Sequence, residues 1–161
     1  MILLIVSLLL AHPIYTYLSF REKRESFIRF LCSILGLLIN MTITLFYFYP
    51  RPFMIGVGHT LIEHAPENSF PSDHATLAFS IAFAFLFLKD FKIGIPLFIL
   101  AFLVDFTRVY VGLHFPLDIV ASLFVSIISG IIVIYFKKEF EKLNKIFNTL
   151  YNKLLKKLKR G

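Results

Sequence analysis

The chain has 161 residues, of which 58% are hydrophobic and 17% are charged, and its formal net charge is +7. Soluble domains contain roughly 45–50% apolar residues, so this composition excludes an ordinary soluble domain, and the single cysteine excludes an intramolecular disulfide. Apolar runs close to the length of a bilayer span instead predict an all-α integral membrane protein.

Five apolar stretches are candidates for transmembrane helices, because about 20 residues of helix cross the hydrocarbon core of a bilayer. They cover residues 1–20, 28–49, 74–88, 93–113 and 116–136. We therefore expect a polytopic membrane helix bundle of about five transmembrane helices, which forms a membrane-embedded domain over residues 1–136. A cleaved signal peptide is the alternative for the first stretch, although its basic cluster follows the apolar run instead of preceding it.

Residues 137–161 differ from the rest of the chain by carrying nine Lys or Arg and only two Glu residues. Their apolar residues recur at three- and four-residue steps, the spacing of one helix face: Phe140, Leu143, Phe147, Leu150, Leu154 and Leu158. We predict a basic amphipathic cytoplasmic tail on anionic lipid of the inner leaflet, with a solvated extension of the last span as the alternative. No nucleic-acid partner is expected, because membrane orientation and lipid account for the charge.

Basic residues are unevenly divided between the two sides of the membrane that five spans would define. Fifteen of the 17 Lys and Arg residues fall on the side of the C-terminal tail, and only Arg51 and Arg108 fall on the other. Cytoplasmic loops carry the excess of Lys and Arg, so we predict that the N-terminus is outside and the C-terminus inside. The two outer arginines need a reason other than topology.

A short polar sequence, Pro71-Ser72-Asp73-His74, directly precedes the third apolar stretch on the predicted outer side. Ser72 is placed as the N-cap of that helix. The unpaired N–H groups at a helix start suit an anion such as phosphate, and His74 would face the same site. The alternative is a helix cap beside a surface histidine.

A second polar cluster lies in the segment TRVYVGLHFPLD. Pro116 suits the first position of a helix, which places Asp118 in the first turn, where a carboxylate is favourable. From there Asp118 can reach one ring nitrogen of His114 and leave the other free as a nucleophile or base. Two structural alternatives are an Arg–Asp ion pair around a buried histidine, and a pair between Asp105 and Arg108 that serves membrane insertion.

Three segments together, Arg51-Pro52, residues 71–74 and residues 107–118, resemble the signature motifs of the type 2 phosphatidic acid phosphatase superfamily, whose members are metal-independent lipid phosphatases. The longer stretch RPFMIGVGHTLIEHAPENSFPSDHATL is similar to bacterial undecaprenyl-diphosphate phosphatases of the bacitracin-resistance type. This resemblance implies recycling of the lipid carrier of cell-wall synthesis at the outer face of the cytoplasmic membrane.

Residue by residue, the resemblance implies catalytic roles for His114, His74 and Asp118. His114 would be the nucleophile that forms a phosphohistidine, Asp118 would orient it, and His74 would act as general acid and then as base. The implied substrate-binding residues are Arg51, Ser72 and Arg108. No metal or cofactor is expected, because the resemblance implies metal-independent enzymes and the sequence has no Cys/His metal spacing. The implied roles are chemically coherent, since phosphoryl transfer needs positioning and charge neutralisation, and the arginine fork matches phosphate oxygens.

Three positions depart from the pattern of the family, and one of them is Thr107, where the third motif usually opens with a serine. Thr44 stands where the first motif has a lysine, and His59 or His64 is the alternative source of that phosphate contact. Asp73 stands where the second motif usually has a glycine. An acidic side chain beside a phosphate would be repulsive unless it points away or pairs with another group.

The leading prediction is therefore an undecaprenyl-diphosphate phosphatase with a polyprenyl diphosphate lipid as its substrate. Phosphatidic acid or phosphatidylglycerol phosphate is the alternative substrate. A non-catalytic transporter subunit or scaffold is the alternative of another class. A transport path would need polar groups through several spans, whereas the polar groups here gather on one side.

Overall fold

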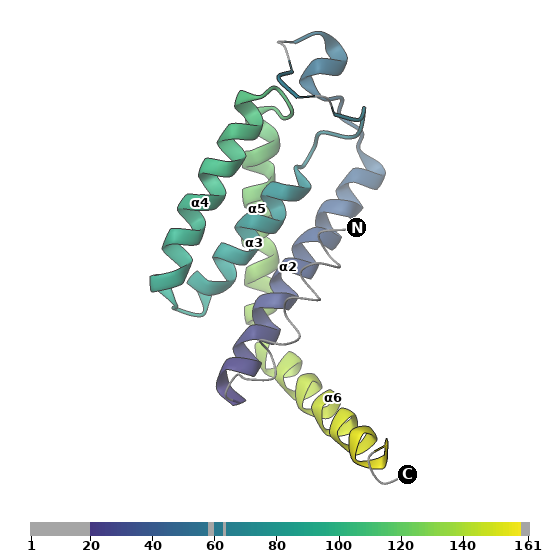
Figure 1. Cartoon of the computed structure of the whole chain (residues 1–161), viewed down its shortest axis with the longest axis vertical. Helices are drawn as coiled ribbons and strands as arrows, with labels where there is room; N and C mark the ends of the chain where they lie inside the picture. Colours follow the sequence, from purple (N-terminus) through teal and green to yellow (C-terminus); the bar gives the residue numbers. More distant parts are fainter. Residues whose placement is uncertain (1–19, 58–59, 63, 159–161) are drawn as a thin grey trace. The chain divides into compact units, whose positions relative to one another are not determined.

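A computed structural model describes residues 20–57, 60–62 and 64–158 of the chain (Figure 1). These residues form five α-helices and one short 3-10 helix, and they contain no named β-strand. The helices are α2 (Phe20–Phe46), η1 (Pro52–Ile55), α3 (Asp73–Phe87), α4 (Phe91–Tyr110), α5 (Pro116–Tyr135) and α6 (Lys137–Leu158). The predicted all-α class is thus confirmed for the described residues, and the predicted stretch 1–20 lies outside them except for its last residue.

The chain divides into two compact units. One contains Met1–Ile28 and Phe136–Gly161, and the other is Arg29–Tyr135. Within the first unit, Arg24 Nε lies 3.3 Å from Glu141 Oε1. Helix α6 begins at the first residue of the predicted basic tail. The division into a membrane domain 1–136 and a tail 137–161, and the contact of that tail with lipid, stay predictions.

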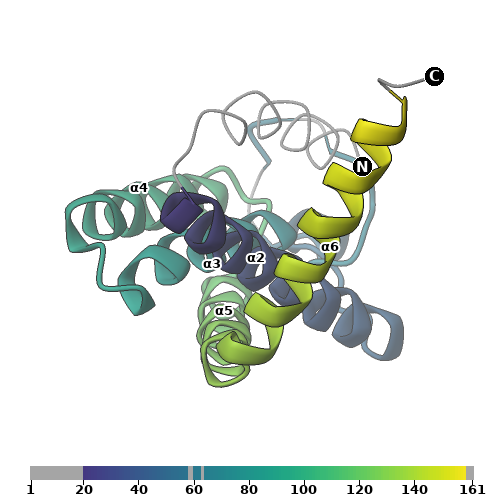
Figure 2. The same ribbon diagram turned by 90° about the horizontal axis from the view of Figure 1, so that it is seen from below.

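Helix α3 is the central helix of the unit Arg29–Tyr135, because it packs along both α4 and α5 (Figures 1 and 2). Ala75, Phe79 and Ala101 form a buried apolar cluster between α3 and α4. The ring of Phe98 on α4 contacts Phe79 and Phe83, with centroid separations of 5.7 and 5.6 Å. The contact between α3 and α4 is therefore made mainly by apolar side chains.

Serine hydroxyl groups form hydrogen bonds across the contact between α3 and α5, beside the apolar side chains of Ile119 and Leu123. Ser122 Oγ donates to Ser72 O at 3.0 Å, and Ser126 Oγ donates to Thr76 O at 2.9 Å. Small side chains let two helices approach closely, and their hydroxyls satisfy polar groups that lipid cannot. These bonds hold the start of α3 beside the first turns of α5.

Helix α2 approaches α3 in the same way. A Cβ atom at Gly36 would lie 2.4 Å from Ser80 Oγ, so the close contact requires a residue without a side chain. One turn further along, Thr76 Oγ1 donates to Asn40 Oδ1 at 2.9 Å. The end of α2 is thereby joined to the beginning of α3.

Many large apolar side chains of the same unit point outward, as in lipid-facing helices. On α4, four such side chains are each 54–56% exposed: Ile99, Leu100, Phe102 and Leu103. Three described helical segments are long and apolar enough to cross a membrane, and one more is apolar but shorter: Arg24–Phe46, Phe91–Tyr110, Pro116–Tyr135 and the shorter Asp73–Phe87. These segments fit a multi-pass membrane protein, while the total of five spans and the orientation of the termini stay predictions.

Two helices, α2 and α4, each end three residues before the predicted apolar stretch does. α4 ends at Tyr110, because Gly112 adopts a φ of +77°, which favours glycine, and the chain turns there. α2 ends at Phe46, and the following loop pairs with a later segment: Ser69 N donates to Tyr49 O at 2.8 Å. Both turns lie at the same end of the unit, and they carry polar side chains, among them Arg51 and His114.

Candidate active site

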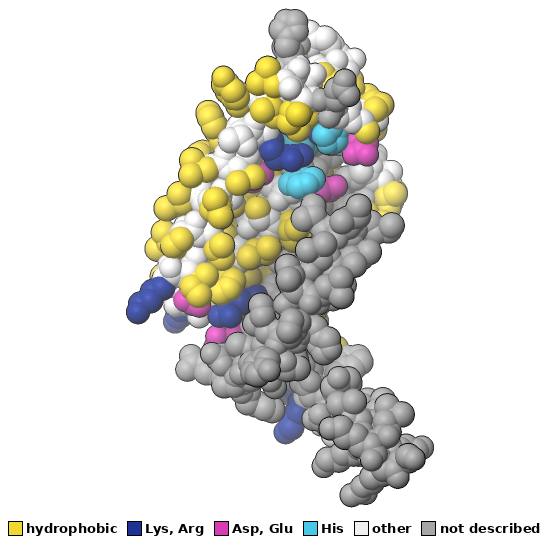
Figure 3. All heavy atoms as spheres, viewed as in Figure 1, with side chains coloured by type: hydrophobic (Ala, Val, Ile, Leu, Met, Phe, Trp, Pro, Cys, Tyr) yellow, Lys and Arg dark blue, Asp and Glu magenta, His cyan; other side chains and the backbone are white. Residues whose placement is uncertain are grey.

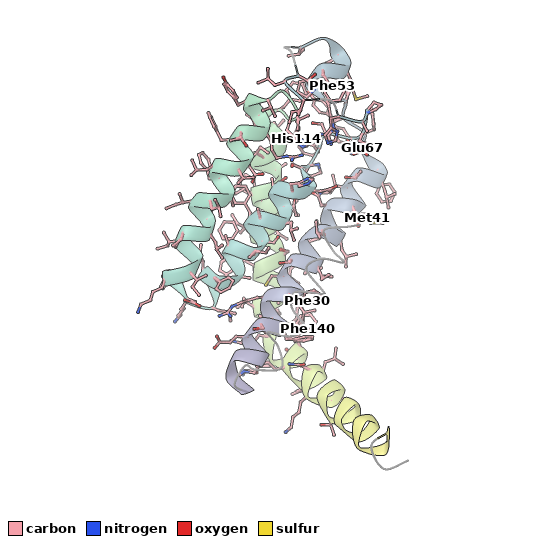
Figure 4. All side chains as sticks on the ribbon, in the orientation of Figure 1. Phe30, Met41, Phe53, Glu67, His114 and Phe140 are labelled. Atoms are coloured by element: carbon pink, nitrogen blue, oxygen red, sulfur yellow. The ribbon has the colours of Figure 1, made fainter. Side chains whose placement is uncertain are left out.

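His114 lies in the turn between α4 and α5 and is 3% exposed. The turn is built by backbone hydrogen bonds from Leu113 N to Arg108 O (3.1 Å) and from Gly112 N to Val109 O (3.0 Å). Figure 4 shows His114 at the end of the unit where the loop after α2 also lies, with Glu67 of that loop nearby. Figure 3 shows histidine, arginine and acidic side chains gathered on this part of the surface, bordered by hydrophobic ones.

The Nδ1 side of the His114 ring faces acceptors. Nδ1 lies 3.0 Å from Ser69 O and 3.3 Å from Asp118 Oδ2. Asp118 is fully buried, and its Oδ2 also accepts hydrogen bonds from Phe115 N (2.9 Å) and from the hydroxyl of Ser69. Because a carbonyl and a carboxylate can only accept, Nδ1 carries the proton in the neutral ring, and Nε2 keeps its lone pair.

The Nε2 side of the ring faces donors. Arg51 Nη1 and Arg108 Nη2 each lie 3.3 Å from Nε2, and Ser72 Oγ lies 3.4 Å from it. The predicted residues of all three segments therefore meet around one nitrogen atom. Two guanidinium groups and a hydroxyl are the donors that phosphate oxygens prefer.

Burial lowers the pKa of His114 below its ordinary value. The hydrogen bond to Asp118 opposes this shift, and the charges of Arg51 and Arg108 lower the pKa further. A lowered pKa keeps the imidazole neutral at pH 7. Neutral imidazole with a free Nε2 is the form that can act as a nucleophile.

Arg51 is held in place by the same turn. Its side chain is almost fully buried, Nη1 donates to Leu113 O at 3.2 Å, and Nη2 lies 3.9 Å from the exposed Glu67 Oε2. The Nε atoms of Arg51 and Arg108 are buried and have no hydrogen-bond partner among the described residues. Arginines with buried donor atoms that are not hydrogen-bonded are typical of a site that takes an anion.

Ser72 is the N-cap of α3, as predicted, and its Oγ accepts from Ala75 N at 3.4 Å. His74 follows two residues later and is exposed. It is close enough to Arg108, His114 and Arg51 to interact with them electrostatically. His74 therefore lies on the open side of the cluster, whereas His114 lies on its buried side.

The structure also bears on two alternatives from the sequence, the pair between Asp105 and Arg108 and the phosphate contact offered by His59 or His64. Asp105 is fully buried, but both of its oxygens lack a hydrogen-bond partner in the described part of the chain, and Arg108 contacts His114 instead. The proposed pair between Asp105 and Arg108 is therefore not formed as a hydrogen bond. His64 Nδ1 is 3.0 Å from the carbonyl of Ala65, outside the cluster, and His59 lies outside the described residues.

Two site residues were missed from the sequence, Ser69 and Asn40. Ser69 directly precedes the FPSDH stretch and provides the closest acceptor for Nδ1 of His114. Asn40 is fully buried in an apolar helix and donates to Asp73 Oδ1 at 2.5 Å. A polar residue inside a membrane span is a functional candidate by default, so Asn40 carried a signal that could have been used.

The chain belongs to the PAP2 superfamily, which residues 26–142 match. The resemblance drawn from the sequence motifs is thus confirmed, and the match includes every residue placed in the cluster above.

The names of two curated relatives both contain the term undecaprenyl-diphosphatase. The chain is 51% identical over 104 residues to undecaprenyl-diphosphatase BcrC of Bacillus subtilis (strain 168), covering 65% of this chain and 53% of that protein. It is 36% identical over 94 residues to the putative undecaprenyl-diphosphatase YbjG of Escherichia coli (strain K12), covering 58% of this chain and 48% of that protein. The chain thus spans about half the length of the curated relatives it matches.

A solved structure supports the fold. The crystal structure of Aquifex aeolicus LpxE superposes with a TM-score of 0.66 at 29% sequence identity, and the match covers 78% of this chain and 76% of that one. The helical arrangement described here is therefore one that a solved protein also adopts.

Proposed function

We propose that this protein is an integral membrane phosphatase that hydrolyses undecaprenyl diphosphate to undecaprenyl phosphate and phosphate. The observation that carries the proposal is the pair of environments around His114. One ring nitrogen is held by acceptors and the other faces two arginines and a serine hydroxyl. Membership in the PAP2 superfamily and the names of the matched relatives support the reaction and the substrate.

In the first step, Nε2 of His114 attacks the terminal phosphorus atom, and the bond from phosphorus to the bridging oxygen breaks. His74, on the open side, gives its proton to that oxygen as undecaprenyl phosphate leaves. Phosphorylation puts a positive charge on the imidazole ring. Asp118 stabilises this charge through Nδ1–H, and it also holds the ring orientation.

In the second step, neutral His74 accepts a proton from water, and the resulting hydroxide attacks the phosphohistidine. The bond between phosphorus and Nε2 breaks, phosphate leaves, and His114 returns to its neutral form. Throughout, Arg51, Arg108 and Ser72 hold the non-bridging oxygens. We propose that this chemistry is independent of a metal ion, because two guanidinium groups supply positive charge where negative charge develops on the phosphoryl oxygens.

The substrate also suits the position of the cluster at one end of the helices. A long prenyl tail stays in lipid, because each buried methylene contributes about 0.8 kcal/mol, so the enzyme meets the headgroup at the membrane surface. We propose that this surface is the outer face of the cytoplasmic membrane, from the 15-to-2 division of basic residues. On that side, the enzyme would recycle the lipid carrier of cell-wall synthesis and raise tolerance of bacitracin.

Phosphate release by the purified protein in detergent tests the proposal. The substrates are undecaprenyl diphosphate, phosphatidic acid and phosphatidylglycerol phosphate, each with and without EDTA. His114→Ala should abolish release, whereas His64→Ala should not change it, because the hydrogen bond recorded for His64 among the described residues goes to the carbonyl of Ala65 and not to the cluster. A preference of tenfold or more for phosphatidic acid would keep the phosphatase and overturn the substrate. Release that His114→Ala leaves unchanged would overturn the mechanism.

Orientation has its own test. A fluorescent protein fused to the C-terminus should be bright, and alkaline phosphatase fused there should be inactive, if the tail is cytoplasmic. The opposite pattern would place the cluster on the inner side of the membrane.

A further inference from the structure

Among the described residues, Asn40 makes three hydrogen bonds, and all three go to the segment that begins α3. Nδ2 donates to Asp73 Oδ1 at 2.5 Å and to Pro71 O at 3.3 Å, and Oδ1 accepts from Thr76 Oγ1 at 2.9 Å. The side chain is fully buried in an otherwise apolar helix. Because a buried amide is costly unless it is hydrogen-bonded, α2 is linked to the first turn of α3 at a defined register.

Asp73 is the partner that needs an explanation, since it places a carboxylate beside a site built for anions. It is exposed and interacts electrostatically with Arg51, Arg108 and His74. A phosphate group would use the same positive charges. A carboxylate in the first turn of a helix is favourable for the helix dipole, but one that turned toward the arginines would compete with the substrate.

The hydrogen bond from Asn40 Nδ2 orients the Asp73 carboxylate. Among the described residues, Asn40 Nδ2 is the hydrogen-bond donor recorded for Asp73, and no ion pair joins Asp73 to either arginine. Arg51 and Arg108 contact His114 Nε2 instead. The two arginines therefore stay available to an incoming phosphate while an acidic residue sits next to them.

We propose that Asn40 is a positioning residue that holds the Asp73 carboxylate away from the phosphate-binding arginines. It acts through Asp73 and does not itself touch the substrate. The inference rests on the proposed function for its substrate, but it concerns anion binding and can be measured without turnover. It also accounts for an acidic residue at a position where the related motif usually has glycine.

The proposal predicts that the two residues depend on each other. Without Asn40, the carboxylate is free to turn toward Arg51 or Arg108 and repel phosphate. Without the carboxylate, the loss of Asn40 should matter much less. A role of Asn40 in helix packing alone would make its loss equally harmful whether or not Asp73 is present.

A double-mutant cycle tests this with Asn40→Leu, Asp73→Gly and both together. The readouts are KM and kcat for undecaprenyl diphosphate, and the shift in Tm caused by vanadate or inorganic phosphate. Asn40→Leu should raise KM about tenfold and reduce the vanadate-induced shift, the order of effect expected from one like charge near the bound anion. Asp73→Gly should stay within about threefold of wild type, and the double variant should return to the level of Asp73→Gly.

The result that overturns the proposal is a double variant as impaired as Asn40→Leu, or an Asn40→Leu protein with the KM and vanadate shift of wild type. Asn40→Ser is made in parallel, because it keeps a small polar side chain if Asn40→Leu does not fold, and it enters the same cycle. If wild type hydrolyses none of the lipid substrates, the proposed function fails. The anion-dependent Tm shifts then still decide the role of Asn40.

Discussion

The two sides of the His114 ring differ in exposure and in whether hydrogen-bond acceptors or donors surround the nitrogen atom. The Nδ1 side is closed and made of acceptors, Ser69 O and Asp118, which are themselves buried. The Nε2 side is made of donors, Arg51, Arg108 and Ser72, and it borders the exposed His74. His114 is thus oriented through Nδ1 and is available for reaction at Nε2. Substitutions on the two sides should therefore change kcat and KM differently.

Breaking the Nδ1 side should have the largest effect on turnover. Asp118→Asn replaces a carboxylate by an amide that can favour the wrong tautomer, and we expect kcat to fall by about 10²–10³ with little change in KM. The loss in kcat should be smaller than the roughly 10⁴-fold loss seen when a catalytic histidine loses the one carboxylate that orients it. Here Ser69 O still accepts from Nδ1 at 3.0 Å. Steady-state kinetics in detergent measures both parameters.

Ser69→Ala is the matched control on the same side. It removes the hydroxyl that donates to Asp118 and keeps the carbonyl that accepts from Nδ1. We expect a loss of less than about tenfold, the usual range for one hydrogen bond. A tenfold rise in KM with unchanged kcat for Asp118→Asn would contradict the assignment of this side to orientation.

Breaking the Nε2 side should affect binding and turnover together. Arg108→Lys keeps the charge but loses the planar fork, and we expect KM to rise and kcat to fall by about tenfold each. Arg29→Lys is the control, because Arg29 pairs with Asp90 at 3.4 Å and should tolerate a lysine there. If Arg108→Lys left KM unchanged, Arg108 would not be holding the phosphate in the ground state.

The pH profile sharpens the comparison, because the two sides shift the pKa of His114 in opposite directions. Burial and the two arginines lower this pKa, and Asp118 raises it. Wild-type kcat/KM should fall on the acid side, below pH 6.5, as the His114 ring becomes protonated, and on the alkaline side as His74 loses the proton that it gives to the leaving group. The acid-side fall reports the pKa of His114. Arg108→Gln should move this fall to higher pH, and Asp118→Asn should move it to lower pH.

The free energy of unfolding should also depend on the protonation of His114. The folded protein takes up a proton on His114 at a lower pH than the unfolded chain, so the unfolding free energy should decrease as pH falls from 6.5 through the folded-state pKa. NMR titration of labelled histidine in detergent reports the pKa without turnover. Equal shifts of the same sign in Arg108→Gln and Asp118→Asn would refute the opposition between the two sides.

The smallest effect is expected from Glu67, which lies at the edge of the Nε2 side. Its carboxylate is 3.9 Å from Arg51 Nη2, and its side chain is 65% exposed, so the ion pair contributes about 0–1 kcal/mol. Glu67→Gln removes a negative charge near the site and should lower KM by about threefold or less, most clearly at low ionic strength. A loss of activity above tenfold would show that Glu67 has a direct role.

Sequence reasoning was successful where the cause is local. The N-cap of α3 at Ser72 and the start of α5 at Pro116 follow from the preferences of serine and proline at helix starts, and both are found in the structure. The proximity of His114 and Asp118 follows from one turn of chain. Family membership also followed from short motifs, because each motif is read within a dozen residues.

The ends of the apolar helices were less predictable, because hydropathy does not change where they stop. Leu113 is as apolar as the residues of α4, yet the helix has ended by then, since Gly112 turns the chain and Leu113 N bonds back to Arg108 O. Similarly, α2 stops at Phe46 while Tyr49 pairs with Ser69 across the loop. Backbone pairing, not side-chain polarity, sets these boundaries.

The sequence by itself determined the helical class, the apolar segments and the residue types gathered at one end of them. Only the tertiary structure decided that Ser69 holds His114 and that Asn40 holds Asp73, across 45 and 33 residues of chain. It also decided that Arg108 contacts His114 instead of forming a hydrogen bond with Asp105. Spacing along a helix limits which neighbours are possible, but a contact between distant segments depends on the register at which helices pack. Here small residues and serine hydroxyls between α2, α3 and α5 set that register.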